Sequence, residues 1–176
     1  MNKKALFALF ALAAICLCAF STPINAGKPG MVVLGNGGGS IKDALLDNEF
    51  NLQTADFTFS FFAGLDKHSE FKGSFHFKRK YADGGTSVGV STEITEIEWE
   101  PNDECRWVTM TGVMTLHAGW AAKPLRGHEF TVTVWDCDDD TDLIWFKIYR
   151  PKPGAERWAL SLLEPTDLTG GNINIR

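Results

Sequence analysis

Residues 130–137 read Phe-Thr-Val-Thr-Val-Trp-Asp-Cys, and large apolar side chains alternate with threonine along most of this stretch. Successive side chains of a β-strand point to opposite faces, so the alternation predicts a strand with one apolar face and one polar face. Residues 105–116, Cys-Arg-Trp-Val-Thr-Met-Thr-Gly-Val-Met-Thr-Leu, follow the same pattern. We expect the two stretches to be antiparallel neighbours in one sheet.

A register that sets Cys105 opposite Cys137 gives this pair of strands two chemically uniform faces. The pairs that follow are Trp107 with Trp135, Val108 with Val134, Thr109 with Thr133, Met110 with Val132 and Thr111 with Thr131. A slip of one residue would mix the faces, because side chains alternate along each strand. Opposed residues have Cβ atoms about 4.5–5.5 Å apart, close to what a disulfide needs.

The chain has four cysteines, and Cys16 and Cys18 lie in an N-terminal segment that we expect to be removed. An even number of remaining cysteines in an exported chain favours a disulfide between Cys105 and Cys137. The alternative is a pair of unpaired buried thiols.

Alternation recurs along the rest of the chain, with turn residues between the segments. The alternating apolar residues are Phe57, Phe59, Phe61, Phe75, Phe77, Ile144, Phe146 and Ile148. Several short strands of this kind predict an all-β fold, a single antiparallel β-sandwich or barrel-like domain after a signal peptide. A hairpin centred on Asp140 is expected to set Trp135 opposite Trp145 and Val134 opposite Phe146.

The first residues are typical of a secretory signal peptide. Lys3 and Lys4 precede an uncharged apolar run, residues 5–20, and small residues lead to Ala26. The run is shorter than the roughly 20 residues of a membrane-spanning helix, which disfavours a membrane anchor as the alternative. Cleavage near Ala26 would leave about 150 residues, an ordinary size for one domain, in a secreted or periplasmic protein.

Three segments are therefore expected: a signal peptide at 1–26, a Gly-rich N-terminal segment at 27–49 and an all-β domain at 50–176. Within the Gly-rich segment, residues 27–39 are expected to pack poorly apart from 31–34. Residues 40–46 are expected to form one or two helical turns capped by Ser40.

The formal net charge is −5, and removal of the signal peptide makes the chain more acidic. Acidic surfaces repel phosphate backbones, and the run Lys78–Lys80 is the one short basic cluster, so nucleic acid is disfavoured as a partner. We expect no membrane contact after the signal peptide is removed.

Several motifs resemble those of a small secreted bacterial β domain, the post-COAP type. They are residues 127–136 (Gly-His-Glu-Phe-Thr-Val-Thr-Val-Trp-Asp), Asp142, Phe146, residues 170–175 (Gly-Gly-Asn-Ile-Asn-Ile), residues 37–41 and residues 57–59. The resemblance covers most of the chain after residue 26 and departs at Asp138-Asp139-Asp140, where the family has more glycine. It implies an exported β-rich fold and brings no established activity or catalytic residues.

The acidic turn is the first candidate site. Asp136, Asp138, Asp140 and Asp142 alternate, and calcium takes several carboxylate oxygens in such loops. An EF-hand would need Gly and Glu at the positions that Thr141 and Lys147 occupy. Since Asp is also a common turn residue, we expect a solvated hairpin turn with at most weak affinity for Ca²⁺, and no other cofactor.

Catalytic motifs are lacking. Glu96, Glu98 and Glu100 share one strand face, whereas a glycosidase needs two carboxylates facing each other across the sugar. The four histidines have no metal-ligand spacing, and there is no Gly-x-Ser-x-Gly elbow. We therefore expect a protein without enzymatic activity, and an extracellular hydrolase is the less favoured alternative.

Three tryptophans carry the binding hypothesis. Trp107, Trp135 and Trp145 have the strand parity opposite to the apolar residues beside them, so they are expected on the outer face as a sugar-binding platform. The alternative is that they pack on each other or under a loop. The chain is thus expected to be a binding or scaffolding module for a glycan or an extracellular protein. A lipocalin-like carrier, with its phenylalanines around a hollow, is the second hypothesis.

Overall fold

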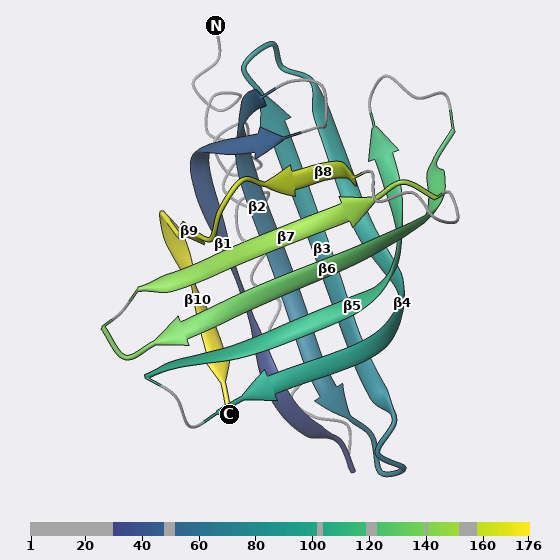
Figure 1. Ribbon diagram of the computed structural model, residues 1–176, viewed down its shortest axis with the longest axis vertical. Coiled ribbons are helices and arrows are strands. Elements are labelled where there is room, and N and C mark those ends of the chain that lie inside the picture. Colours follow the sequence, from purple (N-terminus) through teal and green to yellow (C-terminus); the bar gives the residue numbers. More distant parts are fainter. Residues whose placement is uncertain (1–29, 48–51, 102–103, 119–122, 140, 152–157) are drawn as a thin grey trace, which may run out of the picture.

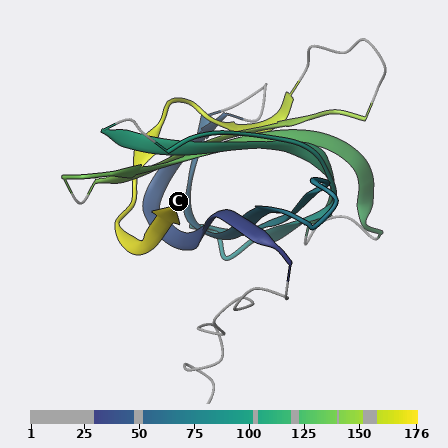
Figure 2. The same ribbon diagram turned by 90° about the horizontal axis from the view of Figure 1, so that it is seen from below.

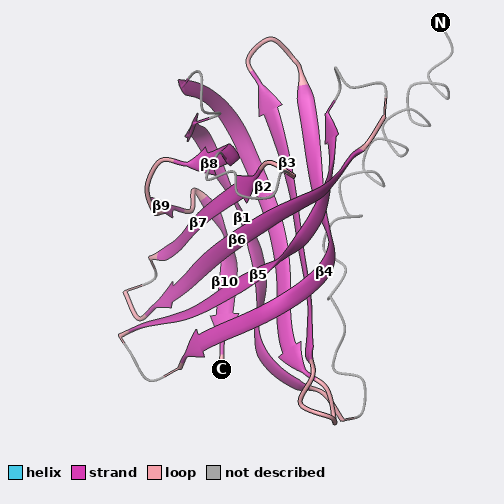
Figure 3. Ribbon diagram, turned by 45° about the vertical axis from the view of Figure 1, so that its right-hand side comes forward, coloured by secondary structure: helices cyan, strands magenta, loops and turns pink. Residues whose placement is uncertain are grey.

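The computed structural model describes residues 30–47, 52–101, 104–118, 123–139, 141–151 and 158–176. Within these ranges every regular element is a β-strand, and Figure 3 accordingly shows magenta strands and no cyan helix among them. The strands are β1 (Val32–Asp47), β2 (Leu52–Leu65), β3 (Phe71–Tyr81), β4 (Thr86–Glu100), β5 (Cys105–Ala118), β6 (Leu125–Cys137), β7 (Asp142–Tyr149), β8 (Trp158–Leu162), β9 (Thr166–Asp167) and β10 (Gly170–Ile175). The all-β prediction is confirmed.

The strands form a closed barrel. Consecutive strands from β1 to β8 are antiparallel neighbours, and β8 also pairs with β1, so that eight strands close on themselves. The two remaining strands, β9 and β10, extend the sheet next to the place where β8 pairs with β1. β9 pairs with β7, and β10 pairs with β1. The sequence left a sandwich and a barrel open. The structure supports the barrel and not the sandwich, because backbone pairing joins the two edges of the sheet.

The barrel is flattened. Figure 1 shows β1, β2 and β3 as one layer behind β5, β6 and β7, which cross it at a steep angle. β4 bends from the first layer into the second, and its pairing with β5 contains two irregularities that accompany the bend. Seen from below, the strands enclose an elongated ring (Figure 2).

Phenylalanine rings from both layers meet inside the ring. Phe57 on β2 and Phe146 on β7 are stacked with centroids 4.8 Å apart, and Phe77 on β3 lies 5.7 Å from Phe146. All three are at most 3% exposed. Burial of each such side chain contributes about 1.5–3 kcal/mol, so this contact between layers is a main stabilising feature of the core.

The predicted register of β5 and β6 is confirmed. Cys105 lies opposite Cys137 and Trp107 opposite Trp135, with Val108 and Val134 paired on the inner face. The two cysteines form a disulfide, with Cα atoms 4.0 Å apart and a sequence separation of 32. Closing a loop of this length restricts the unfolded chain and stabilises the fold by about 3–4 kcal/mol in the chain-entropy account.

The predicted register of β6 and β7 is wrong by two residues. Asp136 lies opposite Asp142, so Trp135 faces Leu143 and Thr133 faces Trp145. Val134 correspondingly pairs with Ile144 rather than with Phe146. A shift of two keeps every side chain on its predicted face, so the face pattern alone could not detect the error.

The strand β1 corrects the expectation for residues 27–49. The predicted helical turns at 40–46 are wrong, because these residues pair with β2 as a strand. Ile41 and Ala44 are both buried, since a bulge between them, with Asp43 at φ 52°, adds one residue. This spacing of three imitates a helix. Its pairing with β2, β8 and β10 makes β1 part of the barrel, which begins before residue 50.

Glycines let β1 lie close to both of its neighbours. A Cβ on Gly38 would lie 2.5 Å from the carbonyl oxygen of Phe59 on β2, and one on Gly171 of β10 would lie 2.3 Å from that of Gly38. Gly171 also has φ +118°, a conformation that L side chains rarely adopt. The Gly-rich segment, expected to pack poorly, is therefore one of the most closely approached parts of the described backbone.

The substitution Gly171→Ala is expected to lower the free energy of unfolding by about 1–3 kcal/mol, because it adds both a clash and a strained φ. Urea unfolding followed by tryptophan fluorescence measures the change. Gly170→Ala is the matched control: its Cβ would meet only Ser40 Oγ at 3.5 Å, and its φ is not in the left-handed range. Equal midpoints for the two variants would contradict the close-approach explanation.

Candidate functional site

The outer face of β5, β6 and β7 carries the tryptophans predicted for binding. We call Trp107, Thr109, Thr133, Trp135 and Trp145 the Trp–Thr face. Each of these side chains is half-buried, whereas the residues that alternate with them, including Val108 and Val134, are fully buried inside the barrel. The strand parity expected from the sequence is therefore confirmed.

The tryptophans form a pair with a third neighbour rather than a line. Trp107 and Trp135 are directly opposite, and Trp145 lies on the next strand, opposite Thr133. Trp145 also packs against buried core residues. The hydroxyl oxygens of Thr109 and Thr133 are 2.8 Å apart and share a hydrogen bond. This threonine pair lies two residues along the strands from the Trp107–Trp135 pair, with Trp145 beside Thr133 on β7.

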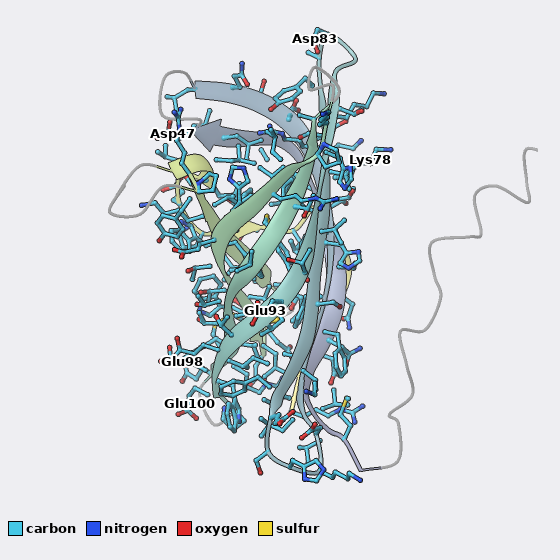
Figure 4. All side chains as sticks on the ribbon, turned by 90° about the vertical axis from the view of Figure 1, so that its right-hand side faces the viewer. Asp47, Lys78, Asp83, Glu93, Glu98 and Glu100 are labelled. Carbon is cyan, nitrogen blue, oxygen red and sulfur yellow. A yellow bond between two sulfur atoms is a disulfide. The ribbon has the colours of Figure 1, made fainter. Side chains whose placement is uncertain are left out.

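Glutamates border the Trp–Thr face on the side of β4. Glu98 lies opposite Thr109 and Glu100 opposite Trp107. Figure 4 shows both carboxylates on the outer side of the β5–β7 layer. Their cross-strand neighbours on β5 are threonine and tryptophan rather than a second acid, so this strand pairing does not set two carboxylates across a gap, as glycosidases require.

The acidic turn uses two of its carboxylates to hold β10. The backbone N–H of Ile175 donates to Asp136 Oδ2 and that of Ile173 donates to Asp142 Oδ2, both at 2.8 Å. Both contacts are partly buried. These two aspartates lie directly opposite each other at the end of β6 and the start of β7. They therefore supply the hydrogen-bond acceptors for backbone N–H groups on the edge of a third strand, β10.

Arg106 links Asp136 to another aspartate of this turn, since its guanidinium also lies 3.4 Å from Asp136 Oδ1. Asp138 is exposed and forms an ion pair with Arg106 at 3.3 Å, and Asp139 accepts the N–H of Thr141. Asp140 lies outside the described residues. In the part of the chain that the structure describes, no three His, Cys, Asp or Glu side chains gather as metal ligands would.

One polar cluster escaped the sequence reasoning. Arg79 lies on the inner face of β3, where its guanidinium stacks over the Tyr81 ring at 4.9 Å and its Nε donates to Ser87 Oγ on β4. Burial lowers the pKa of Arg79 and raises that of Tyr81. Arg79 has the same strand parity as the buried Phe75 and Phe77, so its parity was the signal that could have revealed it.

Among the described residues, no helix is long and apolar enough to span a membrane. The Cys105–Cys137 disulfide is compatible with an extracellular protein, because such bonds persist in oxidising compartments. The predicted signal peptide lies outside the described residues.

Comparisons with protein-family models, with curated proteins and with solved structures found no match for this chain. The resemblance to the post-COAP type therefore stays a prediction, and the case for function depends on the chain's own geometry.

Replacing Asp136 or Asp142 with alanine is expected to lower the free energy of unfolding by about 1–3 kcal/mol each, because a partly buried N–H of β10 loses its acceptor. Amide hydrogen exchange at Ile173 and Ile175 should accelerate in the same variants. Asp138→Ala is the control, since its exposed ion pair contributes at most about 1 kcal/mol. Unchanged exchange at both amides would refute the role assigned to the two carboxylates.

Proposed function

We propose that the chain is a non-catalytic module that binds a glycan on the Trp–Thr face. The observation that carries the proposal is the pairing of Trp107 directly opposite Trp135 on the outer side of the sheet. Two neighbouring indoles on a sheet surface offer a broad apolar area, and the apolar faces of sugar rings are complementary to such an area.

The polar groups beside the indoles suit the hydroxyl groups of a sugar. The Thr109 and Thr133 hydroxyls lie next to the indoles, and Glu98 and Glu100 border them. Hydroxyls donate and accept hydrogen bonds and carboxylates accept them, so the rim can pair with equatorial sugar hydroxyls while the indoles contact the ring. The carboxylates favour neutral or cationic sugars over uronic acids, because like charges repel.

A lipocalin-like carrier remains the second candidate, and the barrel fold is compatible with it. The stacked rings of Phe57, Phe77 and Phe146 weigh against a large apolar ligand, because they join the two layers at the level where a hollow would be needed. The Trp–Thr face requires no rearrangement of this core, and we therefore favour the outer surface as the binding site.

The variants Trp107→Ala and Trp135→Ala are expected to weaken glycan binding at least about tenfold each, a loss of about 1.4 kcal/mol. Affinity electrophoresis through gels containing soluble β-glucan, xylan, chitosan or mannan finds the ligand, and isothermal titration calorimetry then measures the affinity of each variant.

Trp99→Ala is the matched control. Trp99 is 39% exposed but lies opposite Val108, on the face of β4 that faces away from the Trp–Thr face. Its removal should leave glycan affinity unchanged. No retardation by any of these glycans, or equal losses in all three tryptophan variants, would refute the proposal.

A further inference from the structure

The half-buried cation Arg79 lies on the inner face of the barrel, near the hairpin that joins β3 to β4. Along β3 the residues Phe75, Phe77, Arg79 and Tyr81 share the inward parity, and Lys78 and Lys80 are exposed. Figure 4 shows Lys78 pointing away from the barrel on the outer side of the β1–β3 layer. Arg79 is thus turned toward the interior, on the opposite face from its basic neighbours.

The guanidinium of Arg79 is held in place but incompletely satisfied. Its Nε donates to the buried Ser87, and its plane lies over the Tyr81 ring with 4.9 Å to the centroid. Its Nη1 is buried and has no hydrogen-bond partner. Among the ion pairs between described residues, none involves Arg79. A positioned cation with an unused, buried donor is therefore available inside the barrel.

The neighbouring strands supply small or apolar groups and no counterion. Phe57 lies opposite Arg79 on β2, and Ala55 lies opposite Tyr81. On β1, Ala44 lies opposite Ala55, and both alanines are buried. An unpaired charge in such surroundings is costly, and burial accordingly lowers the pKa of Arg79. An anion would offset this cost, since charge-assisted hydrogen bonds are strongest where water is excluded.

We propose that Arg79 binds a small oxyanion, a carboxylate or a phosphate, inside the β3–β4 end of the barrel. Nη1 is the donor to the anion, and Ser87 and Tyr81 position the guanidinium. A guanidinium N–H forms charge-assisted hydrogen bonds with the oxygens of both anions.

The core sets the size of the ligand. Phe57, the cross-strand neighbour of Arg79, is stacked on Phe146 from the opposite layer, so the ring cluster bounds the site from within. A long acyl chain would have to displace these rings, so the proposal is restricted to a compact anion. This site is separate from the Trp–Thr face, and its occupancy does not depend on glycan binding.

The test uses the folded chain with butyrate, inorganic phosphate or chloride at matched ionic strength. Butyrate or phosphate is expected to raise the melting temperature by about 3 °C or more at millimolar concentration, because a ligand that binds only the folded state stabilises it. The more effective of the two identifies the source of the oxyanion. Equal stabilisation by chloride, or none by any anion, would overturn the proposal.

Arg79→Met should abolish the shift produced by the oxyanion, while Lys78→Met, which removes the same charge from the outer face, should retain it. A shift retained by Arg79→Met would contradict the assignment. Should Arg79→Met fail to fold, the ¹⁵N resonance of Arg79 Nε in the wild-type chain decides. Its chemical shift must change with butyrate or phosphate and saturate, and an unchanged signal would refute the site.

Discussion

The barrel depends on the backbone of β1. One edge of this strand pairs with β2, and the other edge is shared by β10 along the glycines and by β8 near Asp47. The close approach of β1 to β2 and β10 requires residues without side chains at several positions. The glycines 37–39 and Gly171 meet that requirement, because Cβ atoms there would overlap backbone atoms of the neighbouring strand or a neighbouring side chain.

Two aspartates complete the junction from the other side. β10 has one edge on β1, and the N–H groups of Ile173 and Ile175 on its other edge donate to Asp142 and Asp136. Side-chain carboxylates thus do what a further strand would do for these amides. Asp136 and Asp142, the first and last of the alternating aspartates, thus have a structural role as acceptors for backbone donors.

Local patterns predicted the faces of the strands and one register, and non-local contacts decided the rest. The β5–β6 register followed from Cys105 and Cys137, because two like residues at one end and uniform faces beyond them left a single consistent alignment. The β6–β7 hairpin had no such marker, and a two-residue shift preserved both faces. For β1, the bulge at Asp43 broke the period of two that identifies a strand. Asp136 and Asp142 owe their roles to Ile175 and Ile173 on β10, which no local window contains.

The place of β10 also determines when the barrel can be completed as the chain is made. Gly35 pairs with Ile175, so residues at opposite ends of the domain must both have emerged before the wall is whole. Until then β1 presents an unpaired glycine-rich edge, and an edge of this kind is prone to pairing with other chains. During vectorial synthesis the domain therefore passes through a stage at which this edge is exposed and aggregation competes with folding.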